Sequence, residues 1–124
     1  MSAAKRILAV DDEPHILKLV AFSLRAGGFE VLEACDGLSA IELAGAEQPD
    51  LILMDVMMPA LDGYEACRRL KDDPGTAHIP VVMLTAKTQI AEQKTGLECG
   101  ALDYICKPFT PKDLVAQVRS FLPE

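Results

Sequence analysis

The sequence predicts an α/β protein with a parallel five-stranded sheet covered by helices on both faces. Short apolar runs alternate five times with amphipathic segments along the 124 residues. Such alternation is typical of βα units, in which each helix returns the chain to the next parallel strand. Two of the runs, LILM and VVML, are apolar throughout, as expected for strands buried on both sides.

Five short aliphatic runs are the expected strands. In chain order they read RILAV, EVLEA, LILM, PVVML and DYIC, at residues 6–10, 30–34, 51–54, 80–84 and 103–106.

The expected helices differ in how clearly the sequence marks them. The first begins at Pro14, which suits the first turn of a helix, and stops before residues 27–28, a glycine pair. The fourth, at residues 88–98, has few apolar residues to anchor it. The last has Thr110 as its N-cap and Pro111 at its first position. The second is marked by Ala40, Ile41 and Ala44, and the third by Tyr64, Cys67 and Leu70.

The totals describe one acidic globular domain over residues 1–124, with no effector domain expected in this chain. A net charge of −7 would repel a phosphate backbone, which argues against direct nucleic-acid binding. No apolar stretch reaches the roughly 18 residues of a transmembrane helix, and the start is no secretory signal. We therefore expect a cytoplasmic location without membrane insertion. The four cysteines form no C-x-x-C pair and are expected to be reduced thiols.

Polar side chains follow four of the five expected strands. Asp11 and Asp12 follow the first, Asp55 the third, Thr85 the fourth and Lys107 the fifth. The carboxyl ends of parallel strands meet at one edge, where open α/β sheets place their working groups. The carboxylate of residue 55 stands out because apolar residues flank it on both sides, and an unpaired buried charge is costly. We therefore expect these side chains to form one site.

Three carboxylates at this edge need a cation. If the first and third strands are neighbours, their ends lie about 5 Å apart. Two ionised carboxylates at that distance repel by about 3 kcal/mol at an effective dielectric constant of 20. Oxygen ligands without Cys or His favour Mg²⁺, with Mn²⁺ as an alternative ion. Such a site suits a phosphoryl group, with Asp55 as nucleophile and with Lys107 and Thr85 binding the phosphoryl oxygens.

Four motifs, in order, closely resemble the receiver domains of bacterial two-component response regulators. They are AVDDEP at 9–14, MDVMMPALDG at 54–63, LTA at 84–86 and DYICKPF at 103–109. The key residues of these motifs are spaced 44, 30 and 22 positions apart, from Asp11 through Asp55 and Thr85 to Lys107. The resemblance covers essentially the whole chain. It implies a flavodoxin-like (βα)5 three-layer sandwich with strand order 2-1-3-4-5.

The resemblance also implies roles for the acids and their neighbours. Asp55 looks like the phosphoacceptor. Mg²⁺ would be held by Asp12 directly, by Asp11 mainly through water, by Asp55 and by the backbone carbonyl of Met57. Met57 and Lys87 would flank the water that later hydrolyses the phosphoryl group, and a Met57 side chain, which makes no strong hydrogen bond to that water, would slow the hydrolysis.

The resemblance further implies a switch that links the site to a distant surface. Thr85 would follow the phosphoryl group and Tyr104 would move inward behind it. This motion would re-aim the face formed by the fourth helix, fifth strand and fifth helix, and the weakly anchored fourth helix suits such a shift. The bond between Lys107 and Pro108 is expected to be cis, an isomer nearly restricted to bonds before proline.

The chain is thus expected to be a signalling switch and not an enzyme with an external substrate. The phosphoryl donor would be a sensor histidine kinase or a histidine phosphotransfer protein. The readout would be a downstream protein target. Dimerisation through the fourth-helix face stays open, since no motif bears on it.

Other interpretations compete for the same residues. Asp12 or Glu13 could cap the first helix, and Tyr104 could be a packing aromatic as readily as a switch. A metal-dependent phosphatase is a rival class, but it would place a second acid two residues after Asp55, where Met57 stands. A flavin-binding module is another, but its phosphate loop should be rich in Ser, Thr and Gly, whereas this chain has DDEP after the first strand.

Overall fold

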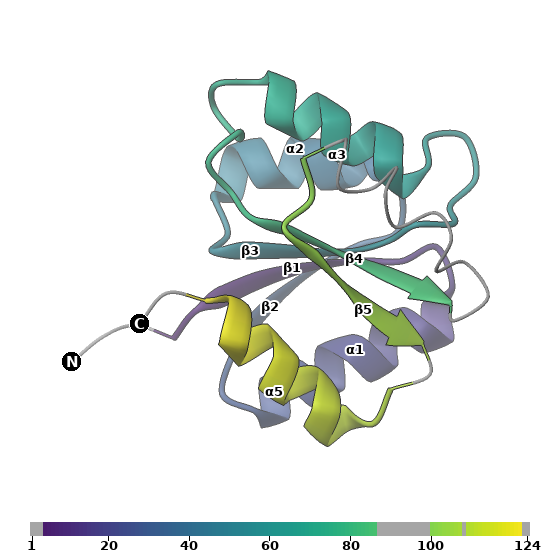
Figure 1. The fold of residues 1–124 in the computed structure, drawn as a ribbon, viewed down its shortest axis with the longest axis vertical. Helices are drawn as coiled ribbons and strands as arrows, with labels where there is room; N and C mark the ends of the chain where they lie inside the picture. Colours follow the sequence, from purple (N-terminus) through teal and green to yellow (C-terminus); the bar gives the residue numbers. More distant parts are fainter. Residues whose placement is uncertain (1–3, 87–99, 108, 123–124) are drawn as a thin grey trace.

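The computed structural model describes residues 4–86, 100–107 and 109–122, and at its centre is a five-stranded sheet (Figure 1). The strand order is β2-β1-β3-β4-β5, and every neighbouring pair is parallel. This order is the one that the resemblance implied. The strands are β1 (Arg6–Val10), β2 (Glu30–Ala34), β3 (Leu51–Asp55), β4 (Val81–Ala86) and β5 (Asp103–Lys107).

Helices lie on both faces of the sheet and complete three layers. α1 and α5 cover one face, and α2 and α3 cover the other (Figure 1). The helix expected at residues 88–98 lies outside the described residues. The predicted α/β class is confirmed. The described helices are α1 (Pro14–Ala26), α2 (Gly37–Glu47), α3 (Gly63–Asp72) and α5 (Pro111–Phe121).

Each face of the sheet has its own apolar core. β3 is buried along its whole length, which explains why its sequence is apolar without alternation. Its successive side chains enter opposite cores: Leu51 and Leu53 pack on the side of α1 and α5, and Ile52 and Met54 on the side of α2 and α3. Each such buried aliphatic side chain contributes about 1.5–3 kcal/mol to the stability of the fold. The sheet therefore holds the residues at its edges in fixed positions.

The helix starts follow local capping rules. Thr110 accepts a hydrogen bond from the Asp113 N–H at 3.1 Å and is therefore the N-cap of α5, as predicted. Asp36 and Asp62 cap α2 and α3 in the same way, although the sequence analysis did not single them out. Glu13 occupies the N-cap position of α1, but its side chain makes no capping hydrogen bond. The capping interpretation is therefore wrong for this residue.

Three strands run further toward the carboxyl edge than their apolar runs predicted. Asp55 and Lys107 are the last residues of β3 and β5, and Thr85 lies inside β4. Parallel pairing continues through them, with Asp55 opposite Leu84 and Thr85 opposite Cys106. The sheet itself, and not a loop, therefore holds these candidate residues.

The described helices and cysteines bear on two further expectations, membrane insertion and disulfides. No helix in the described part of the chain is long and apolar enough to cross a bilayer. Cys35, Cys67 and Cys106 form no disulfide, while Cys99 lies outside the described residues.

Candidate functional site

Two acids and a lysine meet at the carboxyl edge of the sheet. Lys107 Nζ lies 3.1 Å from Asp55 Oδ1 and 3.4 Å from Asp11 Oδ2. Each of the three residues lies two positions beyond a strand residue that packs in the core facing α1 and α5. Because side chains alternate along a strand, all three leave the sheet on that same side. The structure thus brings together residues that are 44 and 52 positions apart in the chain.

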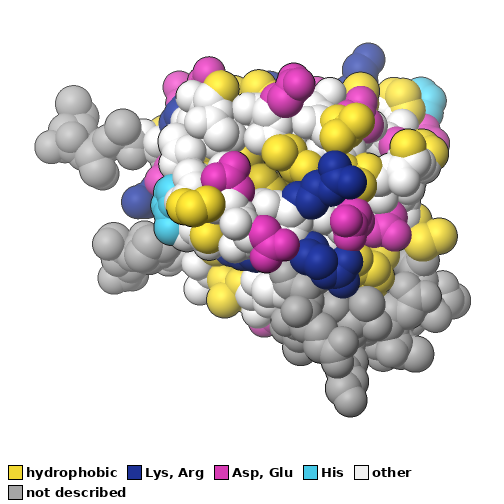
Figure 2. Space-filling model, turned by 90° about the horizontal axis from the view of Figure 1, so that it is seen from above, with side chains coloured by type: hydrophobic (Ala, Val, Ile, Leu, Met, Phe, Trp, Pro, Cys, Tyr) yellow, Lys and Arg dark blue, Asp and Glu magenta, His cyan; other side chains and the backbone are white. Residues whose placement is uncertain are grey.

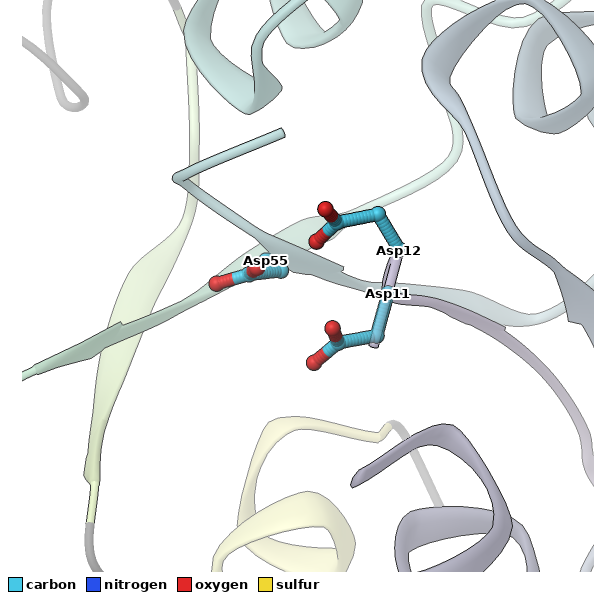
Figure 3. Close-up of side chains that lie close together, drawn as sticks. All are labelled: Asp11, Asp12 and Asp55. Carbon is cyan, nitrogen blue, oxygen red and sulfur yellow. The ribbon is translucent and has the colours of Figure 1, made fainter. Parts of the chain in front are cut away.

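A third acid completes the cluster. One carboxylate oxygen from each of Asp11, Asp12 and Asp55 lies within 4.8 Å of the others. Figure 3 shows the three carboxyl groups gathered at the ends of β1 and β3. Asp11 and Asp55 are only 1% and 6% exposed, whereas Asp12 is exposed. The cluster therefore has two buried acids and one that faces solvent, where an ion could enter.

The two buried acids are held by the same local motif. Asp11 Oδ1 accepts a hydrogen bond from the Glu13 N–H at 2.9 Å, and the Asp55 carboxylate accepts one from the Met57 N–H. An aspartate that binds the backbone two residues on forms an Asx turn, which fixes the side chain at the point where the strand ends. The sequence analysis missed both contacts. The signal was an aspartate at the end of an apolar run, followed by a loop.

The environment of Asp55 works against its charge. Burial raises the pKa of the Asp55 carboxyl, and the negative charge of Asp11 raises it further. The Lys107 ammonium and the Met57 N–H act in the opposite direction, because both stabilise the carboxylate. A cation bound at the cluster would also favour the ionised form, which is the form that can act as a nucleophile.

The cluster fits a divalent cation in both charge and ligand type. Three ionised carboxylates and one ammonium carry a net charge of −2. Among the described residues, Lys107 is the basic side chain that contacts these acids. Carboxylate oxygens without Cys or His suit a hard ion such as Mg²⁺. Asp12 is available to such an ion, since the N-cap position of α1 belongs to Glu13.

Thr85 and Tyr104 lie on the other face of the sheet. Met83 is paired with Tyr104, and both pack in the core facing α2 and α3. Thr85, two residues beyond Met83, leaves β4 on that same side and is fully buried. Tyr104 is 8% exposed, so its side chain is packed inward. The structure thus puts these two residues on one face, with Tyr104 level with Met83 and therefore two residues before Thr85. The burial of Tyr104 agrees with its interpretation as a packing aromatic.

A cleft opens beside the acid cluster. It has a volume of about 450 Å³ and is lined by Asp12, Met57, Met58, Pro59 and Asp62. The Met57 side chain is 60% exposed and forms part of its wall. The acid Asp12 belongs to both the cluster and the cleft, so a molecule in the cleft would reach the cluster.

Two residues of the predicted site lie outside the part of the chain that the structure describes. They are Pro108, which would follow the expected cis bond, and Lys87, which would face the attacking water.

Known proteins are similar to this chain in both sequence and fold. The family model of response regulator receiver domains matches residues 7–119. The DNA-binding dual master transcriptional regulator RpaA of Synechocystis is 46% identical over 117 residues, which are 94% of this chain and 48% of the relative. The chain therefore spans about half the length of the curated relatives that it matches first.

Solved structures agree over nearly the whole chain. The chemotaxis protein CheY4 of Vibrio cholerae superposes with a TM-score of 0.91 at 32% identity, covering 97% of this chain and all of that one, 100%. The receiver domain of a sensor histidine kinase of Pseudomonas aeruginosa superposes with a TM-score of 0.87 at 32% identity, covering 96% of this chain and 98% of that one. That second structure holds a magnesium ion in its active site cleft.

Proposed function

This chain belongs to the receiver domain family of response regulators, and on that premise we propose that it is a phosphorylation-dependent signalling switch with Asp55 as its phosphoacceptor. Its phosphoryl donor is a sensor histidine kinase or a histidine phosphotransfer protein. The observation that carries the proposal is the contact of Lys107 Nζ with both Asp55 and Asp11. That contact brings the proposed nucleophile, a second carboxylate and the lysine ammonium group together at the edge of the sheet.

The reaction is a transfer of a phosphoryl group between two carriers. A carboxylate oxygen of Asp55 attacks phosphorus, and an aspartyl phosphate forms. The P–N bond of the donor phosphohistidine breaks, and the imidazole leaves with its electron pair. Because Asp55 is held by the Met57 N–H and by Lys107, little of its freedom has to be lost before the attack.

The charges around Asp55 oppose the repulsion between its carboxylate and the incoming phosphoryl oxygens. Lys107 is close enough to bind one of these oxygens once the group is attached. The Thr85 hydroxyl, which leaves β4 on the opposite face, binds another oxygen after turning toward the carboxyl edge. Asp11, Asp12, Asp55 and the Met57 carbonyl would hold Mg²⁺. The bound ion would neutralise the charge that develops on the phosphoryl oxygens.

Attachment of the phosphoryl group is coupled to a protein-binding surface. The group adds roughly two negative charges and several acceptor oxygens, which draw the Thr85 hydroxyl toward Asp55. Tyr104 lies on the same face as Thr85 and responds by changing its packing. The surface formed by β5 and α5 is thereby re-oriented. Structures with and without a phosphoryl mimic test this step, and identical Tyr104 side chains in the two would contradict it.

Turnover of an external substrate is not part of the proposal. A phosphatase that uses an aspartyl phosphate would need a second acid two residues after Asp55, and Met57 stands there. The product is therefore the modified protein itself, which loses its phosphoryl group by hydrolysis.

The partners are proteins. The relative from Synechocystis is named as DNA-binding, but this chain covers only 48% of it and has a net charge of −7. On the face formed by α2 and α3, acidic and basic side chains lie side by side (Figure 2), and Glu65 pairs there with Arg68 and Arg69. A surface of mixed sign suits a protein target better than a phosphate backbone.

Intact mass spectrometry tests the function. The protein is incubated with Mg²⁺ and a small acyl phosphate, and one added phosphoryl group is expected. The addition should be absent in Asp55→Asn and should be blocked by a chelator of divalent cations. Wild-type protein that never gains the mass would overturn the proposal.

A further inference from the structure

Gly63, the first residue of α3, lies directly against the backbone of the strand end that presents Asp55. A Cβ atom at position 63 would lie 2.3 Å from the Asp55 carbonyl oxygen and 2.9 Å from the Val56 Cα. It would also lie 2.7 Å from the terminal methyl group of Met83. Real Cβ atoms essentially never approach other heavy atoms closer than 3.0 Å. Any side chain here would therefore displace its neighbours, and two of them are backbone atoms.

Hydrogen bonds show what such a displacement would move. The Gly63 N–H donates to the Val56 carbonyl at 2.9 Å, and the Val56 N–H donates to the Leu84 carbonyl at 3.0 Å. Val56 is thus bonded to β4 on one side and to the start of α3 on the other. Moving the peptide that follows Asp55 would therefore strain or break these hydrogen bonds.

We propose that Gly63 is a positioning residue for the phosphoacceptor, an inference that rests on the proposed function. The missing side chain lets α3 begin in contact with the Asp55 backbone. That contact holds the Asp55 carboxylate at its 3.1 Å distance from Lys107 Nζ. A shift of about 1 Å in a reacting group can slow a reaction by about 100-fold. The effect therefore falls on the rate of phosphoryl uptake as well as on stability.

Two other glycines separate positioning from general packing. A Cβ at Gly27 would lie 2.8 Å from a side-chain methyl of Val115, so Gly27→Ala creates a milder clash, with side-chain atoms, between the end of α1 and α5. A Cβ at Gly45, in α2, would have nothing within 4 Å. Neither Gly27 nor Gly45 lies in the acid cluster or the cleft beside it, so neither variant should change phosphoryl uptake.

The test measures the rate of phosphoryl uptake from acetyl phosphate at saturating Mg²⁺, with folding checked by circular dichroism and thermal melting. Wild-type protein is measured first, because failure of the wild type to take up the phosphoryl group would contradict the proposed function and not the role of Gly63. Gly63→Ala should be slowed 10- to 100-fold. Gly27→Ala and Gly45→Ala should keep the wild-type rate, even though Gly27→Ala melts at a lower temperature. A Gly63→Ala rate within twofold of wild type would overturn the positioning role.

A double variant isolates the backbone contact. Met83→Leu removes the terminal methyl at nearly constant volume, so it relieves the side-chain part of the clash and leaves the clash with the Asp55 carbonyl. Gly63→Ala combined with Met83→Leu should remain slow, while Met83→Leu alone keeps the wild-type rate. Recovery of the rate in the double variant would reduce Gly63 to ordinary packing. Loss of the folded state in both Gly63 variants would also overturn the inference, because the residue would then serve the fold and not the site.

Discussion

Lys107 Nζ contacts Asp55 Oδ1 at 3.1 Å, although β4 lies between the strands that carry the two residues. Neighbouring strands are about 4.8 Å apart, so the lysine side chain spans roughly two strand spacings to reach the carboxylate. The same ammonium lies 3.4 Å from Asp11 Oδ2, beyond the end of β1. The reach of one long basic side chain therefore ties three strands together at the edge where the chemistry is proposed.

Replacing Lys107 with methionine should separate phosphoryl transfer from ion binding. Lys107→Met keeps a long stem but removes the charge, so phosphoryl uptake from a small acyl phosphate should fall by about 100-fold. Affinity for Mg²⁺ should not fall, because the lysine competes with the ion for the same carboxylates. Uptake is followed by mass spectrometry and ion binding by calorimetry. Lys18→Met, on the exposed side of α1, is the control. Equal uptake rates in the two variants would argue against the role of Lys107.

Removing the charge of Asp55 should stabilise the ion-free protein. Burial and Asp11 raise the pKa of Asp55 above its ordinary 3.8, so the ionised carboxylate destabilises the fold once the pH exceeds the raised pKa. Asp55→Asn should therefore melt several degrees higher than wild type at neutral pH in a chelator. As the pH falls through the raised pKa, wild-type Asp55 binds a proton more readily in the folded than in the unfolded chain, and the difference should shrink. Thermal melting from neutral to acidic pH checks this. If the difference in melting temperature grew as the pH fell, the pKa of Asp55 would be lowered in the folded protein and not raised.

The sheet was predictable because its signals are local. Each apolar run became a strand, and the Pro14 and Thr110 helix starts lie where the sequence placed them. The strand ends were less predictable, since Asp55 and Lys107 are polar and join the sheet only through pairing with β4. Asp55 pairs with Leu84, which lies 29 positions further along the chain, and local sequence patterns do not contain such a distant pairing.

The site, like the sheet, was predictable only in part. The topology alone predicted that Asp11, Asp55 and Lys107 would meet, because the ends of parallel strands share an edge. The strand order does not show how much space surrounds each residue or which backbone atoms contact one another. The Asx turn at Asp11 and the tight approach of Gly63 to Asp55 depend on how loops and α3 pack, so only the coordinates reveal them.

The acid cluster should make stability depend on Mg²⁺. An ion that binds the folded chain at 100 times its dissociation constant adds about 2.7 kcal/mol of unfolding free energy. Asp12→Asn should weaken Mg²⁺ binding by about tenfold or more. It should change the stability of the ion-free protein little, since Asp12 is exposed. Melting temperatures are measured against Mg²⁺ concentration, with the exposed Asp72→Asn as the control. If Mg²⁺ raised the melting temperature of Asp12→Asn as much as that of the wild type, the ion would bind elsewhere.

The lifetime of the phosphorylated form should depend on Met57. Its side chain is 60% exposed in the cleft beside the acids and offers no strong donor to an attacking water. Met57→Asn supplies an amide, and one hydrogen bond of about 1 kcal/mol to that water should speed hydrolysis about fivefold. The decay of the phosphorylated protein is followed by intact mass after the donor is removed. Leu38→Asn makes the same polar change at a side chain that is 58% exposed and outside the acid cluster, so its decay should match wild type. Equal decay of the Met57→Asn and wild-type proteins would exclude the Met57 side chain from control of the water.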